Sequence, residues 1–144
     1  MMGSVNKTNA INVRFTYCKN FASAETKSAT WASFANTVTK SVGYDTKEES
    51  IKRAAIVGGV RDDENTGRAD NVKTREILTL DYDDFAGISI NDIVFALEMN
   101  MPHCSWVAYS TFRHTLETPR IRIMAPLSRR VGAAEYSALV GAVA

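Results

Sequence analysis

Residues 78–84 constrain this chain more than any other stretch, because an apolar, β-favouring run there ends directly in acidic residues. Side chains alternate between the two faces of a strand, so Asp81 and Asp83 share one face while Leu80 and Tyr82 take the other. The Cα atoms of the two aspartates then lie roughly 6.5–7 Å apart. Both carboxylates can therefore reach one metal ion, and the stretch predicts a divalent metal site at Asp81 and Asp83.

The surroundings of these aspartates in the sequence are free of cationic side chains. No Lys or Arg occurs over residues 78–103. The charged residues of that span are Asp81, Asp83, Asp84, Asp92 and Glu98. Carboxylates that point the same way without a neighbouring cation favour a bound metal ion. The alternative is an acidic strand end that is simply solvated, because a short Asp-x-Asp pattern often occurs by chance.

Composition adds few constraints beyond the general class of protein. With 144 residues, 45% hydrophobic and 23% charged, the chain can bury a sizeable core as a single domain. No long apolar run or signal peptide is present, which predicts a cytoplasmic protein without a membrane partner. Cys18 and Cys104 lack metal-ligand spacing and are expected to be reduced. The net charge of +1 does not demand a nucleic-acid partner.

Residues 1–74 are expected to form an N-terminal α/β part. Alternation predicts a strand over residues 11–17, followed by a polar loop over residues 19–27. A helical stripe of apolar residues comes next, made of Trp31, Phe34, Ala35 and Val38. A capped helix over 46–53 and a charged loop over 61–72 flank a buried strand over 54–60. Gly58 and Gly59 within that strand indicate a bulge or a close backbone approach.

The second part, residues 75–144, predicts the element order β-α-β-β-α. The acidic strand starts near Arg75, and a helix capped by Ser89 follows it. Two strands are expected over 105–111 and 120–125, and the last helix carries Tyr136, Leu139, Val140 and Val143 on one side. One closing strand would complete a split βαβ unit, an antiparallel sheet backed by two helices. The predicted class is therefore α+β, with a ferredoxin- or RRM-like core.

A second set of motifs lies in this part of the chain. Residues 109–115 read Tyr-Ser-Thr-Phe-Arg-His-Thr, residues 119–122 read Pro-Arg-Ile-Arg, and residues 126–129 read Pro-Leu-Ser-Arg. Together with the acidic strand they resemble the archaeo-eukaryotic primase superfamily, in particular the primase-polymerase domains of phages and prophages. The resemblance covers roughly residues 54–140, including Glu135 and Tyr136 in the last helix.

The resemblance implies a role for each matching residue. Asp81 and Asp83 correspond to the first acidic motif, which holds Mg²⁺ or Mn²⁺ and makes both residues catalytic. Ser110 and His114 correspond to the motif that contacts the incoming nucleotide, with His114 also counted as catalytic. Arg120 and Arg122 correspond to the basic pair beside the triphosphate. The implied partners are a DNA template with its primer, nucleoside triphosphates and a helicase domain or protein.

Two departures from the family pattern shape the expectations. Many relatives carry a histidine where this chain has Phe112. The third acidic motif of the family follows the last helix, on a strand that the 144 residues do not reach. We therefore expect a domain that is incomplete at its C-terminal end and a sheet with one open edge, which residues 1–20 or another copy could fill. Such a chain is expected to bind its ligands but to extend a primer inefficiently.

These residue types also suit the chemistry of nucleotidyl transfer. The reaction uses two metal ions held by clustered carboxylates, and cations that bind the triphosphate, for which arginine offers bidentate contacts. The alternative for Arg120 and Arg122 is a solvated face or an ion pair to Asp81, and for His114 a turn histidine. Two other functions stay open: a non-catalytic RRM-like nucleic-acid-binding module, and a metal-dependent nuclease. A rolling-circle endonuclease is disfavoured because it needs a paired-histidine metal motif.

Overall fold

The structure is a computed structural model, and it describes residues 2–4, 11–20, 23–40, 55–61, 72–83, 87–111 and 113–143. The strands of the larger sheet lie in the order β1 (Met2–Ser4), β7 (Trp106–Ser110), β8 (Arg120–Gly132), β6 (Val72–Asp83) and β5 (Gly59–Arg61). The smaller sheet has the order β3 (Ser23–Thr30), β2 (Asn12–Asn20) and β4 (Ala55–Val57). The helices are α1 (Trp31–Val38), α3 (Ile90–Asn100) and α4 (Ala133–Val143). Neighbouring strands in both sheets are antiparallel.

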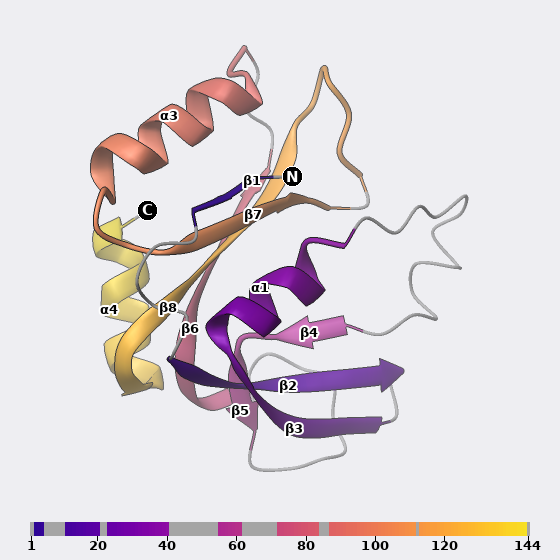
Figure 1. The fold of residues 1–144 in the computed structure, drawn as a ribbon, viewed down its shortest axis with the longest axis vertical. Coiled ribbons are helices and arrows are strands. Elements are labelled where there is room, and N and C mark those ends of the chain that lie inside the picture. Colours follow the sequence, from indigo (N-terminus) through magenta and orange to yellow (C-terminus); the bar gives the residue numbers. More distant parts are fainter. Residues whose placement is uncertain are drawn as a thin grey trace.

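The order β6-α3-β7-β8-α4 confirms the predicted β-α-β-β-α unit and the α+β class, consistent with a ferredoxin- or RRM-like fold. Helices α3 and α4 lie on one face of the larger sheet (Figure 1). The core on this face is built from Leu80, Trp106 and Ile121 of the strands and from Leu97 of α3. The predicted cap of α3 is present, since Ser89 and Asp92 form a capping box. Periodicity and capping signals therefore predicted this half of the fold.

The opposite face of the larger sheet packs against the smaller sheet and α1 (Figure 1). Trp31 and Phe34 stack in the centre of this second core, with ring centroids 5.5 Å apart. The larger sheet contributes Ile77, Val107 and Met124 to the same core. The apolar stripe of α1 is thus a core stripe, and the N-terminal part supports the face of the sheet that carries Asp81.

The polar loop predicted over residues 19–27 is wrong for its second half, which belongs to β3. This strand pairs with β2 from Asn12↔Thr30 to Asn20↔Ser23. Residues 25–28 of β3 are all exposed, so side chains on both faces of this edge strand reach solvent. Such a strand needs no hydrophobic alternation, so its sequence reads as a loop.

The single strand predicted over residues 54–60 is in fact two strands that belong to different sheets. Strand β4 pairs with β2, the chain bends at Gly58, and β5 pairs with β6. A Cβ atom on Gly59 would lie 2.3 Å from Val72 Cγ1 and 3.0 Å from the Thr74 carbonyl oxygen. The predicted close backbone approach at the glycines is therefore confirmed. It allows the chain to pass from the smaller sheet, in β4, to the larger sheet, in β5.

The open sheet edge expected beside the acidic strand is partly covered from within the chain. Strand β5 pairs with the start of β6, from Gly59↔Arg75 to Arg61↔Val72. Further along β6, the Tyr136 hydroxyl accepts a hydrogen bond from the Thr79 N–H (2.9 Å) and donates one to the Thr79 carbonyl (3.2 Å). A side chain of α4 thus replaces a partner strand at Thr79. Strand β1, from the segment expected to fill the gap, pairs with β7 at the other edge.

Several expectations fall outside the described residues. They are the helix over 46–53, most of the loop over 61–72, Asp84 of the cation-free acidic span and the position of Phe112.

Glu76 joins the two sheets. Its carboxylate accepts hydrogen bonds from the backbone N–H and the Nε of Arg14 in β2, at 2.9 and 3.0 Å, and from the Nε of Arg130 in β8, at 3.0 Å. Burial alone would raise the pKa of Glu76, but these hydrogen bonds outweigh it and hold the pKa below the ordinary value of 4.5. The ionised form of Glu76 therefore stabilises the contact between β2 and the larger sheet.

Replacing Glu76 by glutamine is expected to lower the free energy of unfolding by about 1–2 kcal/mol near neutral pH, because three charge-assisted hydrogen bonds are weakened. A lowered pKa in the folded state means that this contribution is complete above the ordinary pKa and is lost as the pH falls through the folded pKa. Urea unfolding at neutral and acidic pH measures the difference between the two proteins. Glu25→Gln, which removes an exposed pair with Lys27, is the control. A difference that persists unchanged in acid would contradict the assignment.

Candidate metal and triphosphate site

The two aspartates of β6 lie directly opposite the two arginines of β8. The register pairs Asp81 with Arg122 and Asp83 with Arg120, so all four side chains share one face of the larger sheet. Arg122 donates to both oxygens of Asp81, from Nε at 2.5 Å and from Nη2 at 3.0 Å. Arg120 Nη1 lies 3.5 Å from Asp83 Oδ2. An ion pair between an arginine and Asp81 is the alternative that the sequence allows, and the structure shows that pair together with a second one.

Each aspartate is more exposed than the arginine that it pairs with. The side chains of Asp81 and Asp83 are 51% and 58% exposed, whereas those of Arg122 and Arg120 are 32% and 25% exposed. The carboxylates therefore face solvent, and a larger fraction of each arginine side chain is covered. An ion that approaches from solvent can reach the carboxylates first.

Tyr109 of β7 is a fifth side chain on this face, and it is the cross-strand partner of Arg122. Burial opposes the charge of Arg122, but the hydrogen bonds to Asp81 and the nearby Tyr109 raise the pKa of the guanidinium above its ordinary value. Burial also raises the pKa of Tyr109. Both groups are therefore protonated at physiological pH. The sequence motifs assign Tyr109 no role, because its position beside Arg122 depends on the register between β7 and β8.

The donor set fits a metal ion that arrives together with phosphate ligands. In the described part of the chain, no group of three or more His, Cys, Asp or Glu side chains could hold a metal ion. Asp81 and Asp83 thus offer two carboxylates, which is the usual protein contribution to a Mg²⁺ ion whose other ligands are substrate phosphates and water. Under this arrangement, the aspartates would hold the ion and the arginines would face its phosphates.

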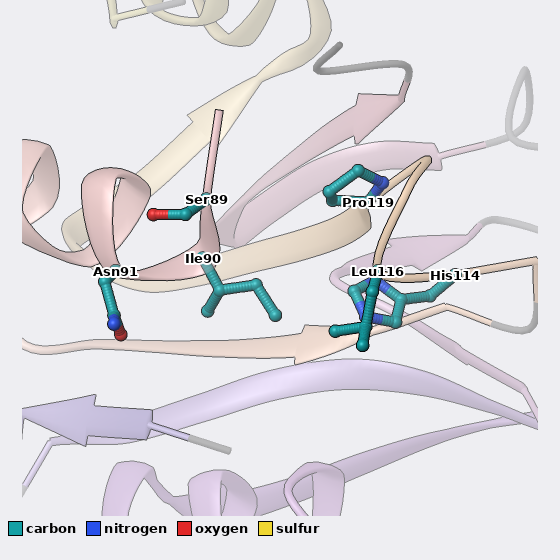
Figure 2. Close-up of a pocket in the computed structure, with 6 residues that line it drawn as sticks. All are labelled: Ser89, Ile90, Asn91, His114, Leu116 and Pro119. Carbon is teal, nitrogen blue, oxygen red and sulfur yellow. The ribbon is translucent and has the colours of Figure 1, made fainter. Parts of the chain in front are cut away.

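His114 lies in the connection between β7 and β8, at the end of the sheet. Its Nδ1 accepts a hydrogen bond from the Arg120 backbone N–H at 3.1 Å, so the neutral imidazole carries its proton on Nε2. His114, Leu116 and Pro119 line a cavity of about 160 Å³ with the start of α3 (Figure 2). The α3 side of this cavity consists of Ser89, Ile90 and Asn91. The structure therefore links His114 to the Arg120 backbone.

Ser110 lies apart from the arginine side chains. Its cross-strand partner is Ile121, whose side chain is in the core beneath α3 and α4. Because cross-strand partners share a face, the Ser110 side chain is on the opposite face from Arg120 and Arg122. Alternation shows which residues share a face within each strand. The face of Ser110 relative to Arg120 and Arg122 also depends on the register between β7 and β8, which the sequence does not show.

Two further motif residues have structural contacts. Arg129 forms an ion pair with Glu135, which joins the end of β8 to the start of α4. The register between β6 and β8 shifts after Pro126, so residues 127–130 form an irregularity of β8. The Pro-Leu-Ser-Arg pattern and Glu135 thus belong to one local structure, away from the aspartates.

A second cavity lies on the face opposite Asp81. Its volume is about 750 Å³, and it lies between α3 and α4 above Leu80 and Ile123 of the sheet. The side chains that line it are mainly apolar, so it does not supply ligands to the Asp–Arg face. Among the described helices, none is long and apolar enough to cross a membrane.

The chain belongs to the VapE N-terminal domain family, which it matches over residues 10–144. This is a phage- and plasmid-associated domain of the replication type. No match was found among curated proteins or among solved structures. The family therefore sets the broad context of replication in mobile genetic elements, and the chemistry must be argued from the site.

Proposed function

We propose that this chain is a primase-polymerase-type nucleotidyltransferase domain that adds nucleotides on a DNA template with the help of Mg²⁺ or Mn²⁺. The observation that carries the proposal is the placement of Asp81 and Asp83 directly opposite Arg122 and Arg120 on one face of the larger sheet, with both carboxylates exposed. The family context of replication and the resemblance of the motifs to primase-polymerases support it. Nucleoside triphosphates, a primed DNA template and a helicase are the proposed partners.

Each side chain of the site has a role in the proposed reaction. Asp81 and Asp83 bind the metal ions, and Arg120 and Arg122 bind the triphosphate through paired N–H groups. A bound divalent ion supplies charge neutralisation on the phosphates and activates the attacking oxygen. His114 can donate from Nε2 while its Nδ1 is held by the Arg120 backbone, which makes it a donor at the rim of the site. We leave Ser110 out of this subsite because it lies on the other face.

Arg122→Ala is expected to weaken the binding of a nucleoside triphosphate at saturating Mn²⁺ by roughly ten- to a hundredfold. One charge-assisted contact contributes about 1.5–3 kcal/mol, and the partial exposure of Arg122 favours the lower end of that range. Fluorescence titration with a labelled triphosphate measures the affinity. The matched control is Arg129→Ala, which removes another arginine of β8 that is paired with a carboxylate. Equal losses in both variants, or none in Arg122→Ala, would contradict the subsite.

A non-catalytic nucleic-acid-binding module is the second candidate, and one observation favours it. Both carboxylates already have guanidinium partners, so their charge does not require a metal ion. In such a module the ion pairs would simply stabilise the sheet. The two candidates differ in one measurable respect, because only the enzyme requires Asp81 for nucleotide transfer.

A further inference from the structure

We infer that the two Asp–Arg ion pairs form a latch, in which the guanidinium groups occupy the carboxylates until the phosphates of a nucleotide draw them away. Metal ion and triphosphate then bind cooperatively, because each removes the competitor of the other. This inference rests on the proposed function and adds a mode of regulation to the same site. The latch consists of Asp81 with Arg122 and Asp83 with Arg120.

Competition for the carboxylates is the first step of the argument. Arg122 places one N–H on each oxygen of Asp81, at 2.5 and 3.0 Å. A divalent cation beside the same carboxylate would meet both the occupied oxygens and the positive charge of the guanidinium. Metal binding to the free protein must therefore displace Arg122 or share Asp81 with it, and either costs binding free energy.

Competition for the arginines is the second step. The oxygens of a triphosphate are acceptors of the same kind as a carboxylate, and arginine binds both through paired N–H groups. The more covered arginine side chains and the exposed carboxylates suit an exchange in which only the charged ends of Arg120 and Arg122 move. A phosphate that accepts these N–H groups leaves Asp81 and Asp83 free for the metal ion.

The two pairs differ in strength, which gives the latch an order of opening. Arg122 makes two hydrogen bonds to Asp81 and lies beside Tyr109, whereas Arg120 approaches Asp83 through one longer contact at 3.5 Å. Asp83 is therefore released more easily, and Asp81 is the carboxylate that the latch protects. Arg122 is consequently the residue whose removal should expose the metal site most.

Titration with Mn²⁺ alone, without nucleotide, tests the latch on the whole chain. Arg122→Gln is expected to bind Mn²⁺ roughly tenfold more tightly than the wild type, which corresponds to about 1.4 kcal/mol. The gain should disappear in the double variant Arg122→Gln/Asp81→Asn. Arg122→Lys keeps the charge but lacks the planar pair of donors, so it should show a smaller gain. Arg129→Gln, on the same strand but in the pair with Glu135, should leave Mn²⁺ affinity unchanged.

The outcomes separate this inference from the function on which it rests. An unchanged or lower Mn²⁺ affinity in Arg122→Gln would overturn the latch. The metal assignment would nevertheless stand if Asp81→Asn weakened Mn²⁺ binding in the same titration. Two further outcomes would overturn the latch, because each would show that the gain in Mn²⁺ affinity reflects charge alone. One is a gain that persists in Arg122→Gln/Asp81→Asn. The other is a gain that appears in Arg122→Gln and not at all in Arg122→Lys. No Mn²⁺ binding in any variant would overturn both the latch and the metal site.

Discussion

Gly59→Ala is expected to lower the free energy of unfolding by at least about 2 kcal/mol and the melting temperature by roughly 5–10 °C. The added Cβ would lie 2.3 Å from Val72 Cγ1 and 3.0 Å from the backbone oxygen of Thr74. Side-chain movement can relieve the first contact, but the second involves the backbone of the neighbouring strand. The pairing of β5 with β6 must therefore open. Thermal unfolding followed by circular dichroism measures the effect.

Gly132→Ala is the matched control for this substitution. Gly132 also belongs to a strand of the larger sheet, and a Cβ there would meet no atom of the described residues within 4 Å. Its effect should stay within about 0.5 kcal/mol. Equal melting temperatures for the two variants would show that the close approach of β5 and β6 is not tight in solution. The same result would remove the structural reason for the glycine pair.

The predictable part of the fold rests on local signals. The stripe of Trp31 and Phe34, the capping box of Ser89 and Asp92, and the alternation around Asp81 each depend on residues close in sequence. Each predicted the correct element because the same side chains that favour it also form the core or the cap. Local and tertiary preferences agree at these positions, as expected for a sequence that specifies one fold.

The missed part depends on contacts between distant segments. Strand β3 forms because β2 offers it an edge, although its own residues are polar. The passage of the chain between sheets at Gly58 depends on where β2 and β6 lie. The hydrogen bonds to Glu76 come from Arg14 and Arg130, which lie on two other strands. None of these contacts has a periodic signal in the sequence.

The candidate site was also predicted in part, because its local pattern is visible in the sequence and its strand pairing is not. Alternation correctly placed Asp81 with Asp83 on one face of β6, and Arg120 with Arg122 on one face of β8. The register between the strands, which sets the Asp–Arg pairs and moves Ser110 to the other face, comes from the pairing of β6, β7 and β8. A shift of one residue in that register would have reversed the face of every side chain in one strand.

Transfer of a single labelled nucleotide to a primed DNA template, with Mn²⁺ present, tests the proposed function most directly. A single transfer is the appropriate readout because it reports the chemical step by itself. The wild-type chain is expected to form the extended product, and Asp81→Asn to slow its formation by about two orders of magnitude or more, because the carboxylate that holds the metal is lost. Glu98→Gln, which removes an exposed acid on α3, should react like the wild type. Equal rates for wild type and Asp81→Asn, or no product from a wild-type chain that binds Mn²⁺ and nucleotide, would contradict the assignment as a nucleotidyltransferase.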